Sequence, residues 1–238
     1  MITIENLNIG YGRRLLLSEA SASFGGCSLT ALIGRNGTGK STLLRALAGL
    51  NHDYSGDIDV DGVSLRGLRP AQLARHLAFV NTQRTRVSNM SCYDVVAMGR
   101  APYTDWIGNL SPADHQIIES SLKAIDMADY ANRPVDTLSD GECQRVMIAR
   151  ALAQDTPNIL LDEPTSFLDL PNRYKLVELL HELAHTRSKC IIFSTHELDI
   201  ALKRADNIAL LADSTIFNLP AREMASSGLI NRYFGIEI

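Results

Sequence analysis

The stretch of sequence that decides the fold is Gly34-Arg35-Asn36-Gly37-Thr38-Gly39-Lys40-Ser41. It fits the pattern GxxxxGK(S/T) at every fixed position, and it lies between an apolar run typical of a buried strand, 29–33, and a stretch that predicts a helix. Small residues let backbone N–H groups curl around phosphates, and the N-terminus of the following helix adds a partial positive charge. We therefore expect this loop to bind a nucleotide, rather than to be a plain glycine turn before a capped helix.

The polar residues at the end of this loop have separate expected roles. Lys40 is expected to reach the β- and γ-phosphates. The Ser41 hydroxyl is expected to bind Mg²⁺, and Thr42, one residue deeper in the helix, to touch the α-phosphate. Gly49 predicts the end of this helix, whose apolar face is formed by Leu43, Leu44, Leu47 and Leu50.

Four further short apolar runs predict strands that are buried on both faces of a parallel sheet: 77–80, 159–161, 190–193 and 208–211. Between about residues 84 and 153 these strand signals vanish. Ser111, followed by Pro112 and Asp114, predicts the start of a helix there. The pattern indicates an α/β fold with a helical lobe inserted into the sheet domain.

Two carboxylates, Asp162 and Glu163, follow the apolar run that ends at Leu161. A strand of a parallel sheet would place both at the edge where the phosphate loop lies. Asp162 is expected to bind Mg²⁺, through water, and Glu163 to polarise the attacking water. A solvated strand end or a helix-capping aspartate would look similar in isolation, but the upstream phosphate loop favours catalysis.

Composition excludes several other classes of protein. The chain has 238 residues and a net charge near -4, with basic and acidic residues interspersed, so no nucleic-acid partner is expected. No basic and apolar leader follows Met1, and no apolar run approaches the ~18 residues of a membrane span. We expect a cytoplasmic protein. The four cysteines lack ligand spacing and are expected to be reduced, mostly packed thiols.

Leu138-Ser139-Asp140-Gly141-Glu142, followed by Gln144 and Arg145, resembles the signature sequence of ATP-binding cassette (ABC) proteins. The other family elements occur in order along almost the whole chain: Tyr11 to stack on adenine, Gln83 in the Q-loop, Asp169 in the D-loop 166–169 and His196 as the switch histidine. The resemblance implies a P-loop NTPase (RecA-like) core, 1–83 and 154–238, with a mainly parallel sheet and an N-terminal antiparallel β portion. It places the helical subdomain at 84–153, within a single ABC ATPase domain.

The resemblance also assigns roles to these residues. Glu163, His196, Lys40 and Gln83 would serve hydrolysis, and Ser41, Gln83 and Asp162 would hold Mg²⁺. Gln83 could equally be an ordinary strand terminus, and Tyr11 could pack on the core. His196 alone would be interpreted as a core or capping residue, but its place in Ser194-Thr195-His196-Glu197 favours a contact with the γ-phosphate. The other five histidines are assigned no function.

In this family two subunits face head to tail and share each ATP, so the resemblance implies a homodimer. Ser139, Gly141 and their neighbours Asp140 and Glu142 would meet the γ-phosphate bound by the partner. The chain departs from the family at Asp140, where glycine is usual, and at Asp213-Ser214, where many relatives have a glycine turn. A carboxylate about 6 Å from a phosphate charge would cost roughly 3 kcal/mol at an effective dielectric near 20.

The runs 96–103 and 149–155 resemble bacterial importers of iron chelates, haem and cobalamin. The resemblance implies an ATP-hydrolysing translocase subunit on the inner face of the cell membrane, with two integral permease subunits and, indirectly, a periplasmic substrate-binding protein. A soluble ABC ATPase that remodels a protein assembly, such as iron-sulfur cluster building, is the alternative. A catalytically dead scaffold is disfavoured by intact Lys40, Asp162, Glu163 and His196.

The region around 83–106 has no catalytic motif and is expected to dock on the membrane subunits. Arg100, Tyr103 and Trp106 are expected on or near that surface, because arginine and aromatic residues dominate protein contacts. Ordinary core packing is the alternative.

Overall fold

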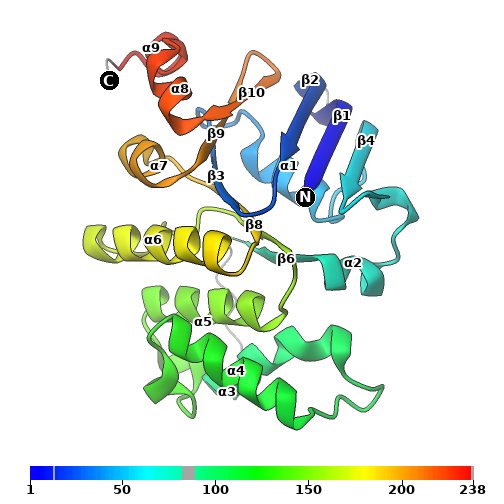
Figure 1. The fold of residues 1–238 in the computed structure, drawn as a ribbon, viewed down its shortest axis with the longest axis vertical. Coiled ribbons are helices and arrows are strands. Elements are labelled where there is room, and N and C mark those ends of the chain that lie inside the picture. The colour runs from blue at the N-terminus through cyan, green and yellow to red at the C-terminus, as the bar shows by residue number, and fades with distance from the viewer. Residues whose placement is uncertain (13, 82–88, 237–238) are drawn as a thin grey trace.

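The fold is built around a six-stranded sheet in the order β10-β9-β3-β8-β7-β6 (Figure 1). The computed structural model describes residues 1–12, 14–81 and 89–236. All neighbouring strands of this sheet are parallel except the β9–β10 hairpin. Its strands are β3 (Ser28–Ile33), β6 (Leu77–Val80), β7 (Asn158–Leu161), β8 (Cys190–Ser194), β9 (Asn207–Ala212) and β10 (Thr215–Pro220).

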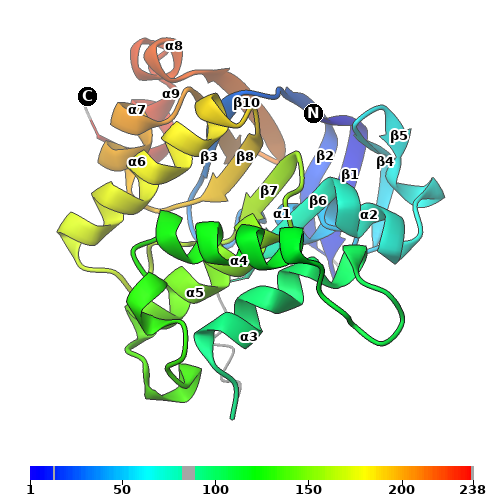
Figure 2. The ribbon, with the colours of Figure 1, turned by 60° about the horizontal axis from the view of Figure 1, so that its bottom comes forward.

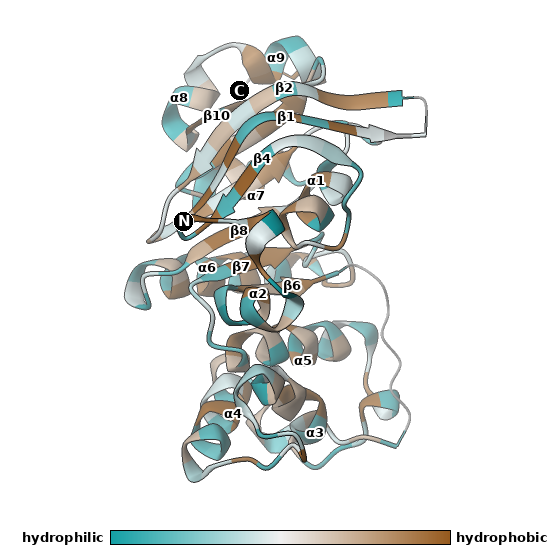
Figure 3. Cartoon of the chain, turned by 90° about the vertical axis from the view of Figure 1, so that its right-hand side faces the viewer, coloured by the Kyte–Doolittle hydropathy of each residue, from teal (hydrophilic) through white to brown (hydrophobic). Residues whose placement is uncertain are grey.

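The apolar runs predicted as strands are confirmed. Every residue of β7 and β8 is buried, because helices cover one face of this sheet and α1 together with a second sheet covers the other. In Figure 3 these strands are predominantly brown, while teal residues are more frequent on the helices at the periphery. The continuous apolar character of each run follows from burial on two faces rather than one.

A second, antiparallel sheet in the order β2-β1-β4-β5 forms the N-terminal β portion. Helix α1 (Lys40–Leu47) shares one hydrophobic core with this sheet and with Leu32 and Ile192 of the central sheet. The helix that follows the phosphate loop is therefore held by both sheets. The strands are β1 (Ile2–Tyr11), β2 (Arg14–Phe24), β4 (Tyr54–Val60) and β5 (Val63–Ser64).

Three helices form the predicted inserted helical stretch: α3 (Cys92–Ala97), α4 (Pro112–Ala124) and α5 (Asp140–Ala153). They pack on one another at one end of the molecule, as Figures 1 and 2 show. Ser111 caps α4 as expected, accepting a hydrogen bond from the Asp114 backbone N–H. Helix α5 connects this group of helices to the central sheet, since it also packs against β6.

The remaining helices lie around the central sheet. They are α2 (Pro70–His76), α6 (Leu170–Thr186), α7 (Leu198–Arg204), α8 (Ala221–Ser226) and α9 (Leu229–Phe234). A 3-10 turn at Leu65–Gly67 precedes α2, and three more lie in the inserted helical stretch, at Met98–Tyr103, Ala128–Tyr130 and Val135–Thr137. Within the described ranges, none of the helices has both the length and the apolar character that crossing a membrane requires. The β9–β10 turn places Asp213 and Ser214 at φ 48° and 57°, a conformation for which glycine would be easier.

Two sequence-based expectations are wrong. Leu50 does not belong to the apolar face of α1, because the helix ends at Leu47, Gly49 turns the chain at φ 66°, and Leu50 is 64% exposed. Arg100 does not lie on the surface. Its Nε atom donates to Asp114 Oδ1 at 2.7 Å, and its Nη1 atom donates to the Ala153 carbonyl at 2.8 Å. An arginine is buried here because two acceptors from other helices converge on it.

Tyr103 and Trp106 differ from Arg100 in this respect. Tyr103 is partly exposed and has the Arg100 guanidinium 4.1 Å from its ring centroid. Trp106 is 93% exposed. Of the three residues expected on or near the docking surface, the two aromatic ones are therefore exposed.

Candidate functional site

The phosphate loop connects β3 to α1 and depends on glycine at two positions. Gly34 has φ 156°, and a Cβ atom there would lie 2.7 Å from Thr38 Oγ1 and 2.8 Å from the Leu211 carbonyl. Gly39 has φ 102° and occupies the N-cap position of α1. Arg35, Asn36 and Gly37 between them are exposed. The loop is thus a backbone surface open to solvent at a helix N-terminus, the kind of site that binds anions.

Lys40 is almost completely buried beneath this loop. Its Nζ atom donates to the carbonyl of Gly34 at 2.9 Å and lies 3.5 Å from that of Arg35. Burial lowers the pKa of Lys40, and the nearby carboxylates of Glu163 and Asp162 act in the opposite direction. Thr38 Oγ1 also donates to the Arg35 carbonyl, which fixes the loop from its other side. The ammonium is thus held close to the position where phosphate oxygens would offer stronger, charge-assisted bonds.

Asp162 lies directly after β7, where two hydroxyls meet one of its oxygens. Ser41 Oγ donates to Asp162 Oδ1 at 3.0 Å, and Ser194 Oγ donates to the same atom at 2.7 Å. A serine hydroxyl beside a carboxylate offers the hard oxygen ligands that Mg²⁺ prefers. The residues present therefore fit Mg²⁺, and Ser41 and Asp162 are brought together as the sequence predicted.

Glu163 is the next residue, and its backbone is in the left-handed region at φ 46°. Its N–H donates to Ser194 Oγ at 2.8 Å, which holds this backbone against the end of β8. One carboxylate oxygen, Oε1, lies 2.6 Å from His196 Nε2, and Oε2 accepts a hydrogen bond from Ser166 Oγ at 3.1 Å. The structure thus places the predicted base and the predicted switch histidine in direct contact.

Ser194 is a site residue that sequence reasoning missed. It is fully buried, and one hydroxyl links the Asp162 carboxylate to the Glu163 backbone. The available signal was a single serine at the end of a buried apolar strand, next to Thr195 and His196. A buried hydroxyl requires hydrogen-bond partners, and the carboxyl end of the neighbouring strand supplies them.

The residues that resemble the family signature begin helix α5. Ser139 caps this helix, and its hydroxyl and backbone N–H both donate to Glu142 Oε2, at 2.7 and 2.8 Å. These bonds lower the pKa of Glu142. Asp140 is the first residue of the helix and is exposed. The Glu142 side chain thus fixes the serine that the resemblance assigns to the γ-phosphate.

The signature-like residues 138–142 lie against the predicted D-loop, 166–169. A Cβ atom on Gly141 would lie 3.1 Å from Leu168 Cδ2, and a pocket of about 470 Å³ lies between the start of α5 and residues 167–172. Asp169 caps α6, accepting a hydrogen bond from the Asn172 N–H at 3.2 Å. A movement of the predicted D-loop would therefore directly change the contacts of residues 139–142.

For three other predicted site residues, the described part of the structure shows no contact that tests the expected role. Thr42 is partly buried in the first turn of α1. Tyr11 ends β1, where its backbone pairs with Arg14, and its side chain is outside what the structure describes. Gln83 lies outside the described residues. The expected contacts with adenine and with Mg²⁺ at these last two positions stay predictions.

Comparisons with known proteins identify the family to which this chain is similar. The sequence profile of the ABC transporter family matches residues 17–166. The petrobactin import ATP-binding protein of Bacillus anthracis is 36% identical over 213 residues, covering 90% of this chain and 78% of that protein. The iron(3+)-hydroxamate import ATP-binding protein of Bacillus subtilis is 32% identical, covering 99% of this chain and 88% of that protein.

Among solved structures, the dimer of an ATP-binding cassette in a post-hydrolysis state with ADP and Pi superimposes with a TM-score of 0.81. It is 25% identical, and the match covers 93% of this chain and 99% of that chain. The chain belongs to the ABC transporter family, and it is an ATP-binding cassette ATPase.

Proposed function

We propose that this chain binds Mg²⁺-ATP on the loop 34–41 and hydrolyses it with Glu163 as the base that orients water. The contact between Glu163 Oε1 and His196 Nε2, beside the Ser41–Asp162 pair, is the observation that carries this proposal. Mg²⁺ would neutralise charge on the β- and γ-phosphates, and Ser41, Asp162 and Gln83 would hold it. His196 would hold Glu163 in place and reach the γ-phosphate, and Tyr11 would stack on adenine.

The working unit that we propose is a homodimer. Ser139, Gly141 and the exposed start of α5 would complete the ATP site of the partner, because a helix N-terminus favours the phosphate charge. The dimeric cassette among the similar structures supports this arrangement. Closure with ATP, followed by loss of the γ-phosphate contacts on hydrolysis, would shift the pair between two states.

We propose import of an iron chelate, haem or cobalamin as the work that this dimer drives. The names of the two relatives, which specify petrobactin and iron(3+)-hydroxamate import, support the iron-chelate class. Two permease subunits would dock on the helical subdomain 84–153, near the exposed Tyr103 and Trp106, while 1–83 and 154–238 form the catalytic core. The chain would lie on the inner face of the membrane, with a periplasmic binding protein engaged indirectly.

The variant Glu163→Gln tests the catalytic proposal. It keeps the shape of the side chain but removes the base, so ATP turnover is expected to fall on the order of 10² to 10⁴-fold while ATP-dependent dimerisation persists. Turnover is measured by phosphate release, and the dimer by size-exclusion chromatography with ATP. Ser166→Ala, which removes the hydroxyl that donates to the Glu163 carbonyl and to Oε2 but leaves the carboxylate in place, is the matched control. Near-normal turnover in Glu163→Gln would show that another group is the base.

Transport is tested separately by purification from membranes. The intact chain is expected to co-purify with a polytopic membrane protein. Co-purification with soluble assembly factors instead would contradict the import proposal, but it would not affect the proposal that the chain hydrolyses ATP.

A further inference from the structure

A second cluster of titratable side chains lies near the amino ends of the central strands, whereas the phosphate loop lies at their carboxyl ends. It consists of His181 and His185 on α6 and Asp206, which precedes β9. The phosphate loop follows the carboxyl end of β3, whereas the Asp206 N–H donates to the carbonyl of Leu29 at the start of β3. Because β3 and β9 run parallel, this cluster and the predicted ATP site lie at opposite ends of these strands.

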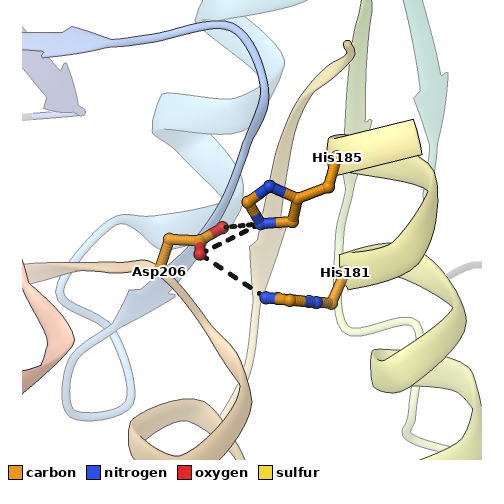
Figure 4. Close-up of side chains that lie close together, drawn as sticks. All are labelled: His181, His185 and Asp206. Carbon is orange, nitrogen blue, oxygen red and sulfur yellow. Dashed lines mark hydrogen bonds and ion pairs between the residues drawn. The ribbon is translucent and has the colours of Figure 1, made fainter. Parts of the chain in front are cut away.

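The three side chains converge on one point (Figure 4). His185 Nε2 lies 3.1 Å from each oxygen of the Asp206 carboxylate, and His181 Nε2 lies 3.5 Å from Oδ1. The histidines are four residues apart on one helix, so their rings lie over the same face, with centroids 4.4 Å apart. Both imidazoles therefore turn a nitrogen toward the same carboxylate oxygen.

The carboxylate is itself held in position by the backbone. Asp206 Oδ2 accepts a hydrogen bond from the Leu29 N–H at 2.8 Å. This bond fixes the orientation of the carboxylate and leaves Oδ1 as the oxygen that both histidines face. Outer hydrogen bonds of this kind are what orient the ligands of a metal ion.

We propose that His181, His185 and Asp206 bind a divalent transition metal of the zinc class. Bonds of 2.0 to 2.1 Å to a tetrahedral ion place neighbouring ligand atoms about 3.3 to 3.4 Å apart. The nitrogen-to-Oδ1 distances of 3.1 and 3.5 Å bracket this value. Two imidazoles and one carboxylate select zinc-like ions over Mg²⁺, which prefers oxygen ligands alone.

Because the three side chains are partly exposed, a water molecule would be able to serve as the fourth ligand of the ion. The exposed fractions are 42% for His181, 44% for His185 and 28% for Asp206, so water reaches the point where the side chains meet. Metal binding through Nε2 would require each neutral imidazole to carry its single proton on Nδ1. The ion would join the C-terminal part of α6 to the segment between α7 and β9.

The proposal is tested by titrating the nucleotide-free full chain with ZnCl₂ in a calorimeter. A Cys27→Ser background removes an exposed thiol that would compete for zinc. One zinc ion per chain is expected. His181→Ala and His185→Ala each delete a ligand and are expected to weaken binding at least about 100-fold, since loss of outer-shell partners alone costs 10 to 100-fold. Both histidines are partly exposed on a helix, so these variants should fold.

His196→Ala is the matched control, because His196 also forms a close histidine–carboxylate pair, with Glu163. It is expected to bind zinc like the parent. As a second readout, Co²⁺ is expected to give the visible absorption of a four-coordinate ion in the parent and in His196→Ala, but not in either α6 variant. A zinc affinity changed less than about tenfold in either α6 variant, or lost in His196→Ala alone, would overturn the proposal.

Discussion

Replacing Asp114 by asparagine tests how the helical lobe is held together. Asp114 accepts hydrogen bonds from the Ser111 hydroxyl and N–H and from Arg100 Nε, and these interactions lower its pKa from 3.8 to about 2. Since one pKa unit corresponds to about 1.36 kcal/mol, the ionised carboxylate contributes about 2 kcal/mol to the free energy of unfolding. The variant also leaves Arg100 buried without a counter-charge, and breaking a buried pair costs about 3 to 5 kcal/mol.

We therefore expect Asp114→Asn to lower the free energy of unfolding by about 2 to 5 kcal/mol at pH 7, measured by urea denaturation. The contribution has a defined dependence on pH. Because the pKa of Asp114 is lower in the folded chain, its stabilisation is complete above the unfolded value of 3.8 and is lost as the pH falls toward 2. The gap between parent and variant should therefore narrow below about pH 4.

Asp94→Asn is the matched control. Asp94 forms the same capping box with Ser91 at the start of α3, but it is exposed. Its loss is expected to cost only about 1 kcal/mol. A difference below about 0.5 kcal/mol for Asp114→Asn at pH 7, or one that stays constant down to pH 3, would refute the reasoning.

Three further predictions concern the site and its surroundings. Ser194→Ala should lower the free energy of unfolding in urea by about 1 to 3 kcal/mol and reduce ATP turnover, because it leaves the Asp162 carboxylate and the Glu163 N–H without this shared partner; unchanged turnover would show that the hydroxyl does not position them. Asp140→Asn in a Glu163→Gln background should lower the ATP concentration for half-maximal dimer about fivefold, and less at high salt. The exposed carboxylate is screened by solvent, so about 1 kcal/mol of repulsion is expected to be removed rather than the roughly 3 kcal/mol at an effective dielectric near 20; an unchanged or raised midpoint would place this side chain away from the nucleotide. Trp106→Ala should change stability by less than about 0.5 kcal/mol and leave basal ATPase intact, yet weaken co-purification with membrane partners; undiminished co-purification would argue against docking there.

The sequence was most informative where a local rule applies. The phosphate loop could be predicted because its glycines, lysine and serine are contiguous and meet one fixed geometry. The five buried strands could be predicted because two covered faces require continuous apolar runs. The helix start at Ser111 follows from this cap, the proline after it and Asp114 in the first turn.

Prediction failed where distant partners decide the outcome. Arg100 was expected on or near the docking surface because arginine is frequent in protein contacts, and nothing beside it in sequence shows that Asp114 and the Ala153 carbonyl converge on it. The spacing of His181 and His185 on a helix was visible, but only the fold adds Asp206 from another element. In the same way, Ser194 acquires its role from the end of a neighbouring strand.

The order of three strands explains why these predicted site residues lie together. The phosphate loop follows β3, Ser194 and His196 lie at the end of β8, and Asp162 and Glu163 follow β7. The parallel register pairs Leu32 with Ser194, and Leu161 with Phe193, so the ends of all three strands are level. Because β8 is the middle strand, its end is positioned to couple the loop that would bind the γ-phosphate to the carboxylate that would activate water. A shift of one residue in the β7–β8 register would move Ser194 to the opposite face and separate the nucleotide contacts from the base, although every motif in the sequence would be intact.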